Sequence, residues 1–299
     1  MPDARAQLET AITSVAKAVE GVLEKYLPVS NEAESRLVEA MRYSMFAGGK
    51  RLRPFMTVLA ADLFGVPKER SLRAAAAVEC IHCYSLIHDD LPTMDDDDMR
   101  RGKPTLHKAF DEATAVLAGD ALQALAFEIL SDEKTHPEAK IRLELVRTLA
   151  HASGMHGMVG GQMIDLTAEH ASLEMGEITR LQQLKTGALI EWSAMAGASL
   201  GRASEHQQHV LLTFARDVGL AFQMADDLLD HEGAANDVGK ATGKDADRGK
   251  ATFVSLMGPD RARAQARALA DQAAHAVAEF GEKAILLQAL AHYMVERDH

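Results

Sequence analysis

The sequence predicts an all-α protein, and three observations support this prediction. Alanine, the residue with the highest helix propensity, is abundant throughout the chain. With 21 glycines and 8 prolines in 299 residues, the chain holds too few turn-forming residues for a β protein of its length. Apolar residues recur at helical spacing almost everywhere, whereas no alternating stretch is long enough to predict a β-strand.

The predicted helices follow one another along the chain, with Gly or Pro between most of them. The first helix carries Leu8, Ile12, Val15 and Val19 on one face. Similar periodicity continues over nine further segments: 34–47, 54–64, 72–90, 112–130, 139–158, 177–198, 205–229, 260–280 and 283–296.

Several predicted helices are apolar on more than one face, over residues 74–87, 113–130 and 210–229. Such helices belong in the middle of a large bundle rather than on its surface. No break in composition and no internal repeat divides the chain. We therefore expect a single domain over residues 1–299.

The overall composition argues against several classes of protein. A formal net charge of −12 disfavours a protein built mainly to bind nucleic acid or an anionic membrane, since both favour clustered positive charge. The polar N-terminus leads into a patterned helix and does not resemble a signal peptide. No run of 18 apolar residues predicts a transmembrane helix. We therefore expect a cytoplasmic protein.

The two cysteines, Cys80 and Cys83, lie in an apolar helical segment. Their spacing suggests zinc or redox chemistry, but a structural zinc site needs four ligands and no second cysteine pair exists. Because free cysteine is usually buried, we predict two buried thiols. By the same pattern, His82 between them is interpreted as a core histidine.

A first acidic cluster follows the predicted helix that ends near His88. Six aspartates fall within ten residues, at positions 89, 90 and 95–98. A charge run is usually a solvated loop, but a carboxylate pair at a helix C-terminus opposes the helix dipole and needs a cationic partner. Pro92 ends the helix and turns the chain, so that Asp95 can fold back toward Asp89.

A second acidic cluster, Asp226, Asp227 and Asp230, lies inside an apolar helical segment, with Asp226 and Asp230 one turn apart. Such carboxylates are costly to desolvate, and Mg²⁺ offsets this cost by binding one or two of them together with substrate phosphate oxygens. Neither cluster has EF-hand spacing. The two clusters hold nine of the 44 acidic residues and predict opposite walls of one metal-binding cavity.

Basic residues supply the positive charge that a phosphorylated ligand requires. Lys50 and Arg53 lie in the segment Gly48–Pro54, where a glycine pair allows close backbone approach and no Walker A spacing is present. Further basic residues lie beside the first acidic run, beside a glycine or in a Gly-rich segment: Arg100, Arg101, Lys185 and Lys240. That last segment, 232–252, is predicted to be a mobile, functional loop.

At this point the sequence resembles the trans-isoprenyl diphosphate synthases over nearly its whole length, most of all the bacterial members that make farnesyl diphosphate. The resemblance lies in six motifs: Gly48–Pro54, DDLPTMDDDDMRRGKPT (Asp89–Thr105), Gly160–Gln162, Lys185–Gly187, FQMADDLLD (Phe222–Asp230) and Gly239–Thr252. It implies the isoprenoid synthase fold, with roughly ten helices around a deep central cavity, and a homodimer.

Position by position, the resemblance also implies roles for single residues. Asp89, Asp95 and Asp226 would bind Mg²⁺, with Asp90 and Asp230 assisting and three ions per active site. The allylic diphosphate would be bound by Arg100, Lys185 and Lys240, and the isopentenyl diphosphate by Lys50, Arg53, His82 and Arg101. Lys185, Thr186 and Gln223 would lie at the reacting carbons as catalytic residues.

The implied reaction is the Mg²⁺-dependent condensation of isopentenyl diphosphate with dimethylallyl and then geranyl diphosphate, by ionisation, condensation and proton loss. The product would be farnesyl diphosphate. Tyr84 lies five residues before Asp89, about 7–8 Å along a helix, and an aromatic residue there would stop the growing chain at fifteen carbons.

Three alternatives remain open at this stage. A synthase of the same family could make geranyl or geranylgeranyl diphosphate instead. A class I terpene cyclase shares the fold but ordinarily lacks the second carboxylate-rich motif and the Gly48–Pro54 site. A non-catalytic partner subunit of such a synthase is disfavoured by the intact aspartates of both motifs.

Overall fold

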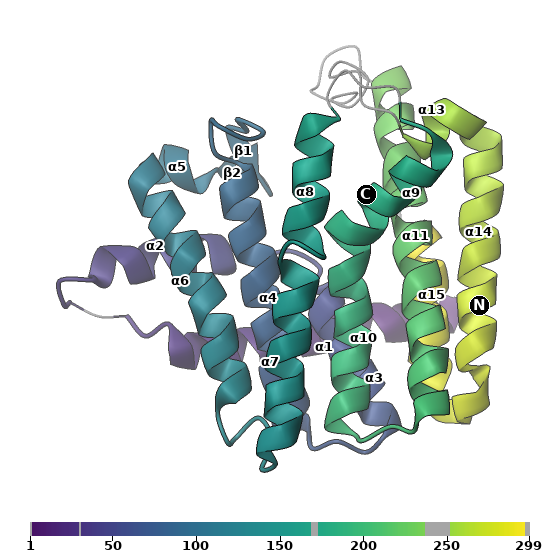
Figure 1. The fold of residues 1–299 in the computed structure, drawn as a ribbon, viewed down its shortest axis with the longest axis horizontal. Coiled ribbons are helices and arrows are strands. Elements are labelled where there is room, and N and C mark those ends of the chain that lie inside the picture. The colour runs from purple at the N-terminus through teal and green to yellow at the C-terminus, as the bar shows by residue number, and fades with distance from the viewer. Residues whose placement is uncertain (1, 30, 169–172, 237–251, 297–299) are drawn as a thin grey trace.

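The computed structural model describes residues 2–29, 31–168, 173–236 and 252–296, and it confirms the all-α prediction. Figure 1 shows most helices running alongside one another, with α1 crossing behind them. The first half of the chain forms α1 (Pro2–Tyr26), α2 (Ser35–Met45), α3 (Leu52–Leu63), α4 (Lys68–Asp89), α5 (Leu106–Ala109), α6 (Glu112–Ser131) and α7 (Ala139–Ser153). The second half forms α8 (Met158–Thr167), α9 (Met175–Gln182), the π-helical segment η1 (Gln183–Gly187), α10 (Ala188–Leu200), α11 (Glu205–Asn236), α13 (Phe253–Met257), α14 (Pro259–Ala276), the 3₁₀ segment η2 (Val277–Ala284) and α15 (Ile285–Glu296).

The core lies where α3, α4, α10 and α11 pack together. Helix α4 packs on α3 and α6, α10 packs on α3 and α11, and α11 packs on α14. Residues 74–78 of α4 are fully buried, as are Leu211, Phe214 and Val218 of α11. The prediction that these two helices lie inside the bundle is therefore confirmed, whereas α6 leaves Val116 and Leu117 exposed.

The sequence did not predict the short hairpin that follows α4. Strand β1 (Met99–Arg100) pairs with the antiparallel strand β2 (Lys103–Pro104). Arg101 and Gly102 connect them with φ values of 51° and 74°, as a tight hairpin turn with two left-handed residues requires. Strands of two residues are too short to produce an alternating pattern, so they leave no signal in the sequence.

Two helix boundaries also differ from the prediction. The predicted helix 139–158 ends at Ser153, because Gly154 is its C-cap and Gly157 precedes a separate helix, α8. Helix α11 continues to Asn236, so residues 232–236 are helical rather than part of a loop. The remainder of the predicted loop up to residue 251, including Lys240, lies outside the described residues.

The two cysteines agree with their predicted role. Cys80 and Cys83 are free thiols, and both are buried on α4. Burial is the main reason that the pKa of each thiol is raised, to about 12 for Cys83. Both are therefore protonated packing residues rather than metal ligands or nucleophiles.

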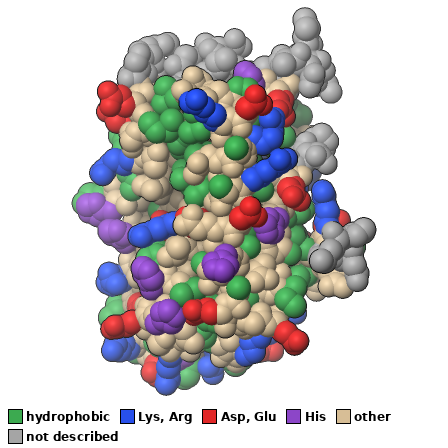
Figure 2. All heavy atoms as spheres, turned by 90° about the vertical axis from the view of Figure 1, so that its right-hand side faces the viewer, with side chains coloured by type: hydrophobic (Ala, Val, Ile, Leu, Met, Phe, Trp, Pro, Cys, Tyr) green, Lys and Arg blue, Asp and Glu red, His purple; other side chains and the backbone are tan. Residues whose placement is uncertain are grey.

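The helices and the surface bear on the membrane and charge predictions. Among the described helices, α6 is long and apolar enough to cross a membrane by length and composition, with 44% of the most apolar stretch buried in the molecule. Core helices pass the same test, so this is a weak indication of a membrane span. Figure 2 shows the face on which α14 lies, where acidic and basic side chains are interspersed over the described surface.

Candidate active site

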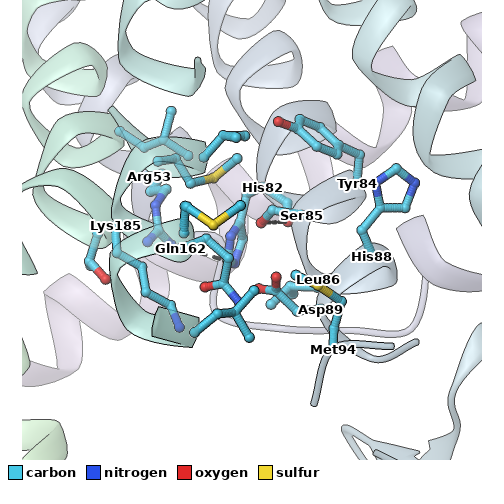
Figure 3. A pocket seen from close by; sticks show the side chains of 16 residues that line it. Arg53, His82, Tyr84, Ser85, Leu86, His88, Asp89, Met94, Gln162 and Lys185 are labelled. Carbon is cyan, nitrogen blue, oxygen red and sulfur yellow. Dashed lines mark hydrogen bonds between the residues drawn. The ribbon is translucent and has the colours of Figure 1, made fainter. Parts of the chain in front are cut away.

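One cavity of about 340 Å³ brings together residues from five helical elements and from the turn after α4. Arg53 comes from α3, His82 and Asp89 from α4, Gln162 from α8, and Lys185 from η1 (Figure 3). Its remaining wall is largely apolar and is formed by Tyr84, Leu86, Met94, Met158, Val159, Met163, Leu166 and Leu189, among others. The cavity therefore combines charged groups with an apolar surface.

The first acidic cluster folds as the sequence predicted. Helix α4 ends at Asp89, Asp90 is its C-cap, and Pro92 follows in the turn. The chain then reverses, so that the Asp95 amide donates to the Asp89 carbonyl at 2.8 Å. The two segments of the motif are thereby held side by side at the end of α4.

The Asp89 carboxyl lies in an environment that disfavours its negative charge. Burial raises its pKa from 3.8 to about 6, and the nearby carboxylates of Asp95 and Asp90 act in the same direction. Lys185 and Arg100 oppose this shift without cancelling it. A cation bound beside Asp89 would stabilise its carboxylate form.

The second acidic cluster is connected to the cavity by a short chain of hydrogen bonds. Thr186, which lines the cavity, donates to the Gln223 side-chain oxygen at 3.1 Å. The Gln223 amide in turn donates to Asp226 at 3.3 Å. Thr186, Gln223 and Asp226 therefore form one unit that spans η1 and α11, whereas Asp230 lies one turn further along α11.

Asp227, the middle residue of this cluster, has a different role. Its carboxylate is buried and accepts a hydrogen bond at 2.8 Å from the amide of Phe253, the first residue of α13. A run of acids does not show which side chain anchors another helix, so the sequence alone does not distinguish Asp227 from Asp226 and Asp230.

Lys185 has a partner that the sequence did not reveal. Its ammonium group lies 2.6 Å from the carboxylate of Asp165 on α8. Gly161 on α8 permits this approach, because a Cβ atom there would lie 2.2 Å from the Lys185 backbone nitrogen. Asp165 follows Gln162 by three residues on the same helix, and residues at this spacing share a helix face. The position of Asp165 beside the Gly160–Gln162 motif could therefore be inferred from the sequence.

The basic residues predicted for isopentenyl diphosphate lie around the start of α3. Arg53 Nη1 is 3.4 Å from His82 Nε2, and both residues line the cavity. Burial lowers the pKa of His82 well below 6.5, and the surrounding arginines, Arg53 first, lower it further. His82 is therefore a neutral, half-buried residue of the cavity wall rather than the core histidine that its sequence context suggested.

Three other predicted residues do not line this cavity. Arg100 and Arg101 line a smaller cavity that shares Leu86 with the first. The Arg100 guanidinium pairs with Asp90 at 2.7 Å, so Asp90 is held by an arginine in this structure. Lys50 is exposed, with its ammonium group 5.7 Å from the centre of the Tyr293 ring.

Tyr84, which the sequence analysis proposes as a limit on chain growth, lies in the cavity wall. Its ring is 4% exposed and packs edge-on against His88, with 5.7 Å between the ring centres. His88 Nε2 contacts the Val116 carbonyl at 3.1 Å. Gly119 makes room for the His88 ring, since a Cβ atom at position 119 would lie 2.1 Å from His88 Nε2.

The donor set fits a hard divalent cation that arrives with a phosphorylated ligand. Among the described residues, no three His, Cys, Asp or Glu side chains converge closely enough to hold a metal ion by themselves. Mg²⁺ ordinarily takes one or two protein carboxylates and completes its coordination with water and phosphate oxygens. The Asp89 carboxyl in the cavity, with its raised pKa, suits that mode of binding.

The cavity of this all-α bundle has charged groups beside an apolar wall, which suits a ligand with a charged group on an apolar tail. Comparison with known proteins gives the family. The polyprenyl synthetase family model matches residues 34–290. The chain therefore belongs to the polyprenyl synthetase family, and it is a prenyltransferase of isoprenoid biosynthesis.

Individual relatives differ in the products that their names give. The chain is 44% identical to the farnesyl diphosphate synthase of Escherichia coli (strain K12), over 98% of each chain. It is 42% identical to the chloroplastic geranylgeranyl pyrophosphate synthase of Catharanthus roseus, over 99% of this chain and 82% of the plant chain. A solved FPP/GFPP synthase from Zymomonas mobilis has 52% identity and a TM-score of 0.89, over 97% of this chain and 99% of that one.

Proposed function

We propose that this prenyltransferase is a farnesyl diphosphate synthase. It joins isopentenyl diphosphate to dimethylallyl diphosphate and then to geranyl diphosphate, and it requires Mg²⁺, with three ions per active site. The observation that carries this proposal is the composition of the 340 Å³ cavity. Arg53, Lys185 and Asp89 suit a metal-bound diphosphate, and the wall around Tyr84 suits a prenyl tail of limited length.

Each condensation breaks one bond and forms another. The C1–O bond of the allylic substrate breaks, and its electron pair leaves with the diphosphate. The double bond of isopentenyl diphosphate then attacks C1, and the proton that is lost from the new chain passes to the released diphosphate. When bound at Asp89, Asp95 and Asp226, assisted by Asp90 and Asp230, Mg²⁺ supplies positive charge that stabilises the departing diphosphate.

The side chains have separate tasks in this scheme. Arg100, Lys185 and Lys240 bind the allylic diphosphate, and Asp165 holds the Lys185 ammonium group at 2.6 Å until the substrate competes for it. Thr186 and Gln223 present their oxygens to the developing positive charge at C1, and their mutual hydrogen bond fixes both side chains. Lys50, Arg53, His82 and Arg101 orient isopentenyl diphosphate.

The test is an incubation of the purified protein with isopentenyl and dimethylallyl diphosphates, with and without MgCl₂. We expect isopentenyl diphosphate to be consumed only with the metal, and mass spectrometry to show a fifteen-carbon product. A twenty-carbon product would instead favour a geranylgeranyl diphosphate synthase, the alternative suggested by the plant relative. A protein that consumes no isopentenyl diphosphate would contradict the proposal.

We also propose that residues 1–299 act as one domain, in a cytoplasmic homodimer. The family match over 34–290 supports the single domain. Exposed apolar residues support the homodimer, since α6 exposes Val116 and Leu117 and α7 exposes Leu143. Light scattering coupled to size exclusion tests the assembly, and a monomer at micromolar concentration would contradict it.

A further inference from the structure

Arg51 is the one basic residue of the Gly48–Pro54 segment that is fully withdrawn from solvent. Lys50 is exposed and Arg53 lines the cavity, whereas Arg51 is 4% exposed. Three cationic positions within four residues therefore have three different environments. Since a buried arginine retains its charge, its partners must be found inside the protein.

The Arg51 guanidinium joins three helices at one point. Its Nη1 lies 2.5 Å from Glu79 on α4, and its Nη2 lies 3.3 Å from Glu20 on α1. Nη2 also donates to the carbonyl of Met45, the last residue of α2. Glu79 is 2% exposed, so this ion pair is fully buried.

The backbone of Arg51 is held in a conformation that it would not adopt unaided. Its φ of 51° and ψ of 41° are left-handed, which a residue with a side chain adopts only where its surroundings impose it. Its carbonyl accepts from the Phe55 amide at 2.9 Å, so this residue also starts α3. The direction in which α3 presents Arg53 therefore depends on how Arg51 is fixed.

The remaining cationic groups are connected to the same segment. The Arg101 side chain donates to the Gly48 carbonyl, and Gly49 lies directly over its guanidinium, where a Cβ atom would be 2.7 Å from Cζ. Two residues of α4 contact the arginines of this segment. Glu79 binds Arg51, and His82, which lies three residues later, contacts Arg53. Helix α4 thus contacts both Arg51 and Arg53.

We propose that Arg51 and Glu79 are positioning residues for the diphosphate of isopentenyl diphosphate. Neither side chain would touch that substrate. The buried pair fixes the backbone of residues 48–53 so that Lys50, Arg53 and Arg101 converge on one diphosphate. This inference rests on the proposed function and extends it to residues outside the binding site.

The experiment compares KM for the two substrates in Glu79→Gln and Arg51→Lys. Lysine lacks the planar fork by which Arg51 binds Glu79 through Nη1, and Glu20 and the Met45 carbonyl through Nη2. We expect KM for isopentenyl diphosphate to rise about tenfold or more, and KM for geranyl diphosphate to stay within about twofold. Equal changes in both KM values, or no change in either, would overturn the proposal.

A matched control separates positioning from general stability. Arg73, also on α4, pairs with Asp132 at 2.7 Å and with Thr135 at 2.8 Å, but it does not line the cavity. Arg73→Lys should lower Tm, as Arg51→Lys does, while both KM values stay at the wild-type level. A rise in KM for isopentenyl diphosphate in this control would show that the effect follows lost stability, against the proposal.

A double variant covers the case in which a single change prevents folding. Replacing both members of a buried ion pair by apolar residues is often neutral for stability, whereas removing one member leaves a buried charge. Arg51→Met combined with Glu79→Met should therefore fold and still show the raised KM for isopentenyl diphosphate. Recovery of the wild-type KM in this double variant would overturn the proposal.

The outcomes also distinguish this inference from the proposed function. A wild-type protein that consumes no isopentenyl diphosphate would contradict the proposed function, and the positioning role with it. An active wild-type enzyme whose Glu79→Gln and Arg51→Lys variants keep the wild-type KM would contradict the positioning role alone.

Discussion

Replacing Tyr84 by alanine should lengthen the product by one isoprene unit. The Tyr84 ring is 4% exposed and forms part of the wall of the cavity, where it packs against His88. A prenyl chain that grows away from Asp89 along α4 would meet this ring. Removing the ring therefore opens space at the far end of the chain, while the charged groups keep their positions.

The size of the effect follows from the volumes involved. Truncating a large buried side chain leaves a cavity on the order of 100–150 Å³, and an apolar cavity of about 150 Å³ accommodates benzene, with six carbons. One isoprene unit has five carbons, so the added space suits one further unit beside the present cavity of about 340 Å³. The cost in stability should be near the lower end of about 3–5 kcal/mol, because the ring already borders a cavity.

The assay is mass spectrometry of the products made from dimethylallyl and isopentenyl diphosphates. We expect the twenty-carbon product to replace most of the fifteen-carbon product in Tyr84→Ala. Tyr84→Phe retains the ring and should retain the wild-type product. Tyr26→Ala removes a tyrosine of α1 that does not line the cavity, and it should also retain the wild-type product. A wild-type product distribution in Tyr84→Ala would refute the reasoning.

Three further predictions follow from the site. Asp89→Asn and Asp226→Asn should each lower kcat about a hundredfold or more with little change in Tm. As a control, Asp98→Asn should remain active, because the Asp98 side chain is 74% exposed. An active Asp89→Asn variant would contradict the metal assignment. Because burial raises the pKa of Asp89 from 3.8 to about 6, folding of the metal-free protein favours its protonated form, and this contribution to stability is lost as pH rises through that range. Mg²⁺ requires the carboxylate, so the increase in Tm that Mg²⁺ produces should grow between about pH 5 and 7; thermal denaturation with an equal increase at every pH would contradict this. Gly119→Ala should push the His88 ring into the cavity, since the new Cβ atom would lie 2.1 Å from Nε2, and should raise the share of ten-carbon product; an unchanged product mixture would show that the ring has room elsewhere.

Local patterns were enough to predict most of the helices and the outline of the site. The apolar period of 3.6 residues is a property of each segment on its own, so α4 and α11 could be placed without knowing their neighbours. The reversal that brings Asp95 to Asp89 was also predictable, because Pro92 acts within the same ten residues.

Other features depend on contacts between distant segments. The ion pair of Lys185 with Asp165 requires α8 and η1 to be packed together, and the bond from Phe253 to Asp227 joins residues of α13 and α11. The spacing of apolar residues does not show that Asp227 and the neighbouring Asp226 have different roles. The orientation of Arg51 is fixed by α1, α2 and α4, so the sequence alone placed it among bases without showing that it turns inward.

The π-helical segment η1 has a consequence for how this chain can vary. Gln183–Gly187 lies between α9 and α10 without an intervening loop, so residues before and after it belong to one continuous rod. A π-turn is equivalent to one residue inserted into an α-helix, and each residue of an α-helix turns the chain by about 100°. Deleting a single residue here would rotate Lys185 and Thr186 relative to α10 without shortening any loop. The number of residues in the continuous helix formed by α9, η1 and α10 is therefore constrained as tightly as their identity. Natural insertions or deletions should occur before or after this helix but not within it.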